Sequence, residues 1–162
     1  SLLGLHLGVD PQHVHGYVIG EHGDSEVLTW SLVTVGSMHL GDYCSQQDIP
    51  LDKRIQEDID KKVRNFAYEI IQGKGATYYG IGSALAKIAD VIIHDQRSIL
   101  TVSAPHPKDP DLSGICISMP HLVGGKGIIS SIPLILDNEE RQLLKKSADK
   151  LRSVVNEVKE ML

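Results

Sequence analysis

The sequence predicts a single α+β domain, and three observations lead to that fold class. Apolar residues recur at helical spacing over residues 51–72 and 137–162, whereas residues 98–136 hold short apolar runs separated by clusters of turn-forming residues. The chain has no internal repeat, low-complexity tract or linker. A chain of 162 residues can bury roughly 70% of its unfolded surface, so an ordinary hydrophobic core is expected.

The N-terminal third is expected to combine a helix end, a strand and a loop. Residues 2–7 have the leucine pattern of an amphipathic helix without a capping residue before it, so we expect the sequence to begin inside an element. Residues 14–19 predict a short strand that leads into a polar loop at residues 20–25. We predict that the apolar stretch 27–35 is helical and that residues 36–50 are irregular.

The clearest helix is predicted over residues 51–72, where one apolar face recurs and where Gly73 and Gly75 end the pattern. A second helix is predicted over residues 79–93. Its many small residues suit a helix that lines a pocket or crosses a neighbour. The aromatic pair Tyr78 and Tyr79 is predicted to serve packing rather than stacking on a ligand.

The last third predicts short strands followed by a helix. The strands are expected at residues 99–102, 115–117 and 128–132, separated by a surface turn at 105–111 and by a glycine-rich turn at 124–127. Asp137 and Glu140 have the spacing of a capping box at the start of the final helix. Its apolar stripe is formed by Leu144, Ala148, Leu151, Val155, Val158 and Leu162.

Composition excludes several classes of protein. With 16 basic and 21 acidic residues the net charge is −5, which argues against a nucleic-acid-binding protein. No stretch approaches the roughly 20 apolar residues that a membrane span needs. Two cysteines form no disulfide framework, and the first residues lack a signal-peptide pattern. We therefore expect a cytoplasmic protein with no membrane partner.

The strongest functional signal is the loop at residues 20–25, which reads GEHGDS. A histidine side chain with an unperturbed pKa of about 6.5 can donate and accept a proton near neutral pH, so His22 is predicted to be an acid–base catalyst. The glycines on both sides allow the backbone to present the ring, and Glu21 or Asp24 would favour its charged form. The alternative is a simple turn in which Asp24 or Ser25 caps a following helix.

Two other kinds of site are not supported by the spacing of residues. His13, His15 and His22 cluster in sequence, but Cys44 and Cys116 lie far away and no zinc spacing occurs, so no metal site is predicted. The glycine-rich segments 73–78 and 80–85 lack the third glycine of a dinucleotide-binding turn and follow no strand. A nucleotide-binding domain is therefore not predicted within this chain.

Taken together, these residues resemble the C-terminal half of the lactate/malate dehydrogenase family, on its L-lactate dehydrogenase branch. Four segments carry the resemblance in the order of the family: VDPQHVHGYVIGEHGDSEV at 9–27, KGATYYGIG at 74–82, ILTVS at 99–103 and KSADKL at 146–151. The combination of the first two segments is specific. The resemblance implies twisted antiparallel strands packed with long helices.

The resemblance also implies roles for individual residues. His22 would exchange a proton with a small 2-oxo or 2-hydroxy acid, and Thr77 would line the substrate pocket, where a threonine favours lactate over malate. Ile81 shares a helical face with Thr77 and would lie against the nicotinamide ring. His15 matches a position that allosteric bacterial members use to hold a sugar bisphosphate. NAD as cofactor and a homodimer or homotetramer are implied as well.

Parts of the family pattern have no counterpart in the chain. These are the glycine-rich NAD-binding half, the aspartate that orients the catalytic histidine, and the arginines that bind the substrate carboxylate and close the mobile loop. We therefore expect residues 1–162 to form the substrate-binding domain, with the N-terminal Rossmann domain absent, and to have no turnover alone. A related malate or other 2-hydroxy acid dehydrogenase, and a noncatalytic oligomerisation module, remain alternatives.

Overall fold

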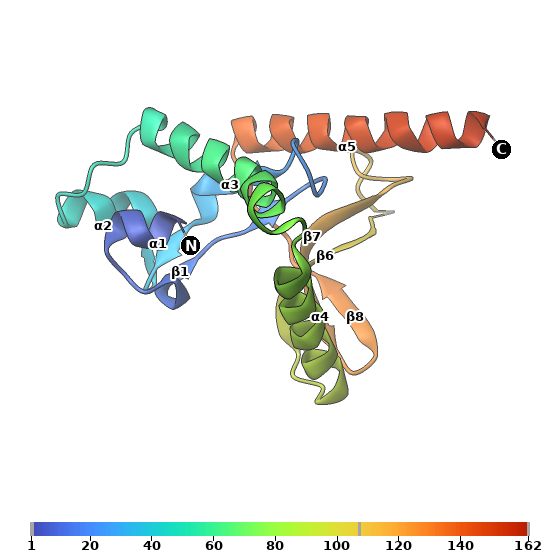
Figure 1. Ribbon diagram of the computed structural model, residues 1–162, viewed down its shortest axis with the longest axis horizontal. Coiled ribbons are helices and arrows are strands. Elements are labelled where there is room, and N and C mark those ends of the chain that lie inside the picture. Colours follow the sequence, from blue (N-terminus) through green and yellow to red (C-terminus); the bar gives the residue numbers. More distant parts are fainter. Residues whose placement is uncertain (1, 107, 162) are drawn as a thin grey trace.

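The computed structural model describes residues 2–106 and 108–161, with long helices packed around small antiparallel sheets (Figure 1). The helices are α1 (Leu2–Leu7), α2 (Leu40–Gln46), α3 (Lys53–Lys74), α4 (Tyr78–Ile93) and α5 (Asn138–Glu160), with short 3-10 helices η1 (Pro11–His13) and η2 (Trp30–Leu32). The strands are β1 (Val14–His15), β2 (Val18–Ile19), β3 (Val27–Leu28), β4 (Thr34–Val35), β5 (Met38–His39), β6 (Ser98–Pro105), β7 (Cys116–Gly124) and β8 (Gly127–Ser131).

The strands form three antiparallel sheets. The largest has the order β6-β7-β8, and the two smaller ones have the orders β1-β4-β5 and β2-β3. Gly20, directly after β2, forms an isolated antiparallel bridge with Ser118 near the start of β7. This bridge connects the small β2-β3 hairpin to the large sheet, so the predicted loop at residues 20–25 begins at the edge between two sheets.

Two hydrophobic cores hold these elements together. One core joins β2, β3 and β7 to the inner face of α5 and contains Ile19, Val27, Leu112, Ile115, Ile117, Met119, Leu144 and Ala148. The other joins α1, α2 and β4 to the N-terminal half of α3 and contains Leu3, Leu7, Val33, Val35, Leu40, Cys44 and Ile59. The first core buries one face of α5, and the second core buries one face of α3. The loop at residues 20–25 lies between these two helices.

Local geometry confirms two of the predicted helix ends, Gly75 after α3 and the capping box before α5. Asp52 caps α3 by accepting a hydrogen bond from the Ile55 amide, and Gly75 ends it in the left-handed conformation at φ 77°. Gly73 lies inside the helix and does not end it. Asp137 and Glu140 form the predicted capping box at the start of α5. The predicted fold class, α+β with antiparallel strands and long helices, is confirmed.

Several predicted elements differ from the structure in the first 50 residues. The strand expected at 14–19 is divided into β1 and β2, which pair in different sheets. The helix expected at 27–35 is wrong, because β3 and β4 pair with β2 and β1 and because the Thr29 hydroxyl donates to the Tyr17 carbonyl. Residues 36–50 are not irregular but contain β5 and α2, whose first turn is capped by His39.

Differences later in the chain concern length and exposure. The strand expected at 115–117 is the start of the longer β7, in which Pro120 and His121 lie within the central strand. Tyr78 and Tyr79 do not pack inside the domain, since their exposed fractions are 75% and 87%. Within the apolar stripe of α5, Leu144 and Ala148 are buried whereas Val158 is half-exposed. Pro107 and Leu162, which belong to the predicted turn and stripe, lie outside the described residues.

A search of the described residues found no helix that is long and apolar enough to cross a membrane.

Candidate functional site

The loop at residues 20–25 is fixed at both of its ends. Ile19 and Val27 flank it, and each is 1% exposed in the core beneath α5. The Gly20 amide donates to the Ser118 carbonyl at 2.9 Å and the Ser118 amide donates back at 3.1 Å. Gly20 has a φ of +98°, and a Cβ atom there would lie 2.7 Å from the Ser147 hydroxyl, so only glycine fits this entry to the loop.

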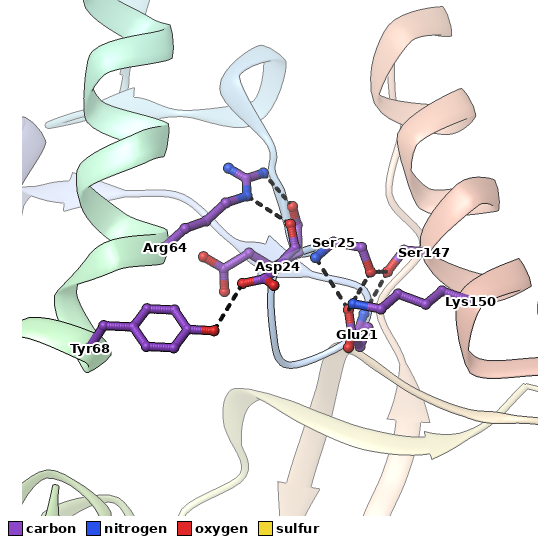
Figure 2. A network of polar contacts seen from close by, with 8 residues as sticks. Glu21, Asp24, Ser25, Arg64, Tyr68, Ser147 and Lys150 are labelled. Carbon is purple, nitrogen blue, oxygen red and sulfur yellow. Dashed lines mark hydrogen bonds and ion pairs between the residues drawn. The ribbon is translucent and has the colours of Figure 1, made fainter. Parts of the chain in front are cut away.

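The C-terminal helix α5 binds the first half of the loop (Figure 2). The Glu21 amide donates to the fully buried Ser147 hydroxyl at 2.7 Å, and the Glu21 carboxylate pairs with Lys150 at 3.0 Å. The same carboxylate accepts hydrogen bonds from the Ser25 hydroxyl and from the Ser25 amide, the latter at 3.2 Å. Glu21 thereby closes the loop on itself and attaches it to α5.

Helix α3 binds the second half of the loop from the opposite side (Figure 2). The Arg64 guanidinium donates through Nε to the Asp24 carbonyl at 3.0 Å and through Nη2 to the Glu26 carbonyl at 2.7 Å. The Tyr68 hydroxyl donates to the Asp24 carboxylate at 3.3 Å. The loop is therefore held between two helices that are far apart in the sequence.

The pKa values of Glu21 and Glu26 are shifted in opposite directions. Burial alone would raise the pKa of Glu21, but hydrogen bonds from Ser25 and Lys150 outweigh it and the pKa is lowered. Burial raises the pKa of Glu26, and the positive charges of Arg64 and His22 only partly offset that rise. Glu26 therefore has an electrostatic interaction with His22.

His22 lies at the tip of this fixed loop. Its side chain is exposed and makes no hydrogen bond within the described part of the chain, although every other polar side chain of the loop has one. The alternative reading, in which Asp24 or Ser25 caps a helix, is wrong: strand β3 follows the loop, Asp24 binds Tyr68 and Ser25 binds Glu21. A fixed backbone that presents an exposed imidazole is an arrangement suited to proton transfer.

The other predicted site residues lie on separate elements. Thr77 precedes α4 as its N-cap residue, and its hydroxyl makes no capping hydrogen bond. Ile81 is in the first turn of α4 and is 58% exposed, among other exposed apolar side chains. His15 is exposed on β1, opposite Thr34. Among the described residues, none of these three makes a hydrogen bond or an ion pair with His22, so their roles stay predictions.

No metal site emerges from the described ranges: they contain no group of three or more histidine, cysteine or acidic residues that could hold an ion. The titratable pair outside the loop is formed by His106 and His121, whose ring centroids are 5.1 Å apart. Burial lowers the pKa of His106, and His121 is 1% exposed with its Nδ1 bound to the Met119 carbonyl. These two rings belong to the packing of the large sheet.

Four residues that fix the loop are missing from the sequence-based prediction: Arg64, Tyr68, Ser147 and Lys150. Each lies on a helix whose apolar stripe is readable, but the polar residues beside such a stripe look like an ordinary solvated face. Ser147 offered one signal, because it lies next to Ala148 on the buried side of α5. A small polar residue at a buried helical position requires a hydrogen-bond partner, which here is the loop.

The fold and the loop together define an α+β domain that presents an exposed imidazole from a backbone fixed by two helices. Comparison with known proteins identifies its relatives. The chain belongs to the lactate/malate dehydrogenase family, as the model of that family's alpha/beta C-terminal domain matches residues 1–162. The resemblance stated from the sequence is confirmed.

Named relatives and solved structures agree with this assignment. The chain is 50% identical to L-lactate dehydrogenase of Geotalea daltonii and 47% identical to that of Chloroherpeton thalassium; each alignment covers 98% of this chain and 50% of the relative. The minor L-lactate dehydrogenase of Enterococcus mundtii, solved in a ligands-bound form, is similar with a TM-score of 0.89 and 37% identity, over 96% of this chain and 49% of that one. A lactate dehydrogenase from a deep-sea metagenome library of the Medee basin has a TM-score of 0.89 at 34% identity, over 96% of this chain and 49% of that one. The chain spans about half the length of the curated relatives it matches.

Proposed function

We propose that this chain is the substrate-binding domain of an NAD-dependent L-lactate dehydrogenase, with His22 as its acid–base catalyst. One observation carries the proposal: the His22 imidazole is exposed at the tip of a loop that α3 and α5 hold from both sides, and within the described residues it makes no hydrogen bond. Membership of the lactate/malate dehydrogenase family supports the reaction class.

In the proposed reaction, protonated His22 donates its ring N–H proton to the carbonyl oxygen of pyruvate while a hydride adds to the carbonyl carbon. The products are lactate and a neutral His22, and the reverse reaction returns the proton to the imidazole. NADH supplies the hydride when it is bound. Pyruvate reduction needs the protonated ring and lactate oxidation needs the neutral ring. A histidine is suited to this reversible step because both states are accessible near neutral pH.

The residues present fit only part of the cofactor. Ile81 offers an exposed apolar side chain of the kind that packs against the flat face of a nicotinamide ring, and Thr77 precedes it where the substrate pocket would form. No glycine-rich phosphate turn follows a strand in the sequence, so the phosphates of NAD would bind elsewhere in the complete protein. For that reason we expect residues 1–162 by themselves to show no turnover.

The proposal extends to partners and regulation. A homodimer or homotetramer acting on a small 2-oxo or 2-hydroxy acid in the cytoplasm is our expectation, and His15 is the candidate contact for a sugar bisphosphate. A related dehydrogenase of malate or of another 2-hydroxy acid is the alternative substrate assignment. The exposed apolar side chains of α4 favour the second alternative, a noncatalytic oligomerisation module.

A substitution of His22 in the complete protein distinguishes these functions. We expect His22→Asn to lower kcat for NADH-dependent pyruvate reduction about 10²- to 10⁴-fold, because the proton donor is lost. The matched control is His13→Asn, an exposed histidine on η1 outside the loop, which should leave the rate unchanged. A near-normal rate for His22→Asn would contradict the catalytic role, and an inactive unaltered protein would favour the oligomerisation module.

A further inference from the structure

Arg64 of α3 donates hydrogen bonds to the backbone of the loop that carries His22. Its guanidinium binds two backbone carbonyls, those of Asp24 and Glu26, which lie on either side of Ser25. The third contact of the same group, from Nη1 to the Asp60 carbonyl at 3.5 Å, stays within α3. Arg64 therefore joins the backbone just after His22 directly to the long helix.

We propose that Arg64 is a positioning residue for His22, holding the loop backbone so that the imidazole meets the substrate oxygen. The inference rests on the proposed function of His22. On the other side, the Glu21 amide bound to Ser147 attaches the residue just before His22 to α5. Figure 2 shows the two attachments, from Ser147 to Glu21 and from Arg64 to Asp24. His22 and Gly23 lie between them in the chain, so the backbone that carries the imidazole is held from both sides.

The attachment to α3 has a second consequence. The helix continues from Arg64 to Lys74, and Gly75 then leads to Thr77 at the start of α4. Arg64 therefore attaches the loop of His22 to α3, and only Gly75 and Ala76 separate the end of this helix from Thr77, the predicted substrate-pocket residue. A misplacement of about 1 Å in such an arrangement can lower a catalytic rate by about 10²-fold.

Geometry rather than charge alone makes arginine suitable here. Glu26 and Asp60, whose pKa values are raised by burial, both lie within the electrostatic reach of the Arg64 cation. A lysine would keep that positive charge, but its single ammonium group lacks the planar fork that reaches two carbonyls at once. Arg64→Lys therefore separates positioning of the loop from neutralisation of the buried carboxylates.

The test uses the complete protein with Arg64→Lys, and Arg54→Lys as the matched control on an exposed part of α3. We expect Arg64→Lys to lower kcat about 10- to 100-fold with the KM for NADH unchanged. The solvent deuterium isotope effect on kcat should rise, because a misplaced proton donor makes proton transfer slower than the other steps. This isotope effect is the ratio of kcat in H2O to kcat in D2O, so a lower fraction of folded enzyme does not change it. Arg54→Lys should leave all three quantities unchanged.

Hydrogen exchange gives a readout that does not depend on activity. The amides of residues 21–26 should exchange about tenfold faster in Arg64→Lys than in Arg54→Lys. Equal exchange in the two variants would overturn the positioning role, and so would faster exchange with unchanged kcat and isotope effect. If the unaltered protein has no dehydrogenase activity and His22→Asn changes nothing, the proposed function fails, while the exchange data still decide whether Arg64 holds the loop.

Discussion

The loop at residues 20–25 and helix α4 both carry predicted site residues, yet they are held in opposite ways. The loop is short and polar, and α3, α5 and β7 bind it through backbone and side-chain hydrogen bonds. Helix α4 is long and apolar, but Val91 is its only fully buried side chain among the described residues. The position of His22 is thus determined inside the domain, whereas the surroundings of Ile81 are not.

The exposed side of α4 is extensive. Figure 1 shows the helix extending away from α3 and α5 along the large sheet. Its exposed apolar side chains are Tyr78, Tyr79, Ile81, Leu85, Ile92 and Ile93. Large exposed apolar patches mark interaction sites, and six apolar side chains of this one helix are exposed. We therefore expect another surface of the complete protein to cover the exposed side of α4, whereas the loop of His22 is already fixed by contacts among the described residues.

Two glycine substitutions should show the largest difference in stability between the loop and α4. Gly20→Ala should lower the free energy of unfolding by about 3 kcal/mol, because a Cβ at φ +98° is strained and meets the Ser147 hydroxyl at 2.7 Å. Gly80→Ala on α4 should raise it by about 0.5–1 kcal/mol, since nothing lies within 4 Å and alanine favours a helix. Urea unfolding measures both values, and a Gly20→Ala variant as stable as the unaltered chain would show that the loop adapts.

The same contrast explains what the sequence could predict. Helices α3, α4 and α5 and the capping box at Asp137 follow from local spacing, and the GEHGDS pattern locates His22. The hydrogen bonds of Arg64 and Ser147 to the loop could not be predicted from the sequence, because only tertiary packing brings these residues together. Short apolar runs such as 27–35 fit a helix or two strands equally well, and the pairing of β3 and β4 with distant partners decides between them.

A charge introduced on the exposed side of α4 should have an intermediate effect, on activity rather than on stability. Ile81→Lys should change the free energy of unfolding by less than about 0.5 kcal/mol, because the side chain is already 58% exposed. In the complete protein it should lower kcat/KM about tenfold, equivalent to roughly 1.4 kcal/mol, if this surface meets the nicotinamide. Ile135→Lys, at a residue that is 87% exposed outside α4, should change neither quantity. Equal activity of the two variants would remove Ile81 from the site.

The smallest effect is a difference in pH dependence between the two regions. The pKa of Glu21 is lowered because hydrogen bonds from Ser25 and Lys150 outweigh its burial, so its carboxylate is favoured in the folded state. A lowered carboxyl pKa contributes stability above the ordinary glutamate pKa of about 4.3, and that contribution is lost as pH falls through the folded value. On α4 the pKa of Asp90 is lowered too, chiefly by the hydrogen bond from Gln96.

The two carboxylates should nevertheless respond differently to substitution. Glu21→Gln should be less stable than the unaltered chain by a constant amount above pH 5, and the difference should shrink below about pH 4.3 as Glu21 becomes protonated. Asp90→Asn should differ little at any pH, since the Asp90 side chain is 47% exposed and water screens its charge. Urea unfolding between pH 7 and pH 3 measures both curves. A Glu21→Gln difference that stays constant down to pH 3 would mean that the loop is held by its backbone contacts to Ser147 and Arg64, with no contribution from the Glu21 charge.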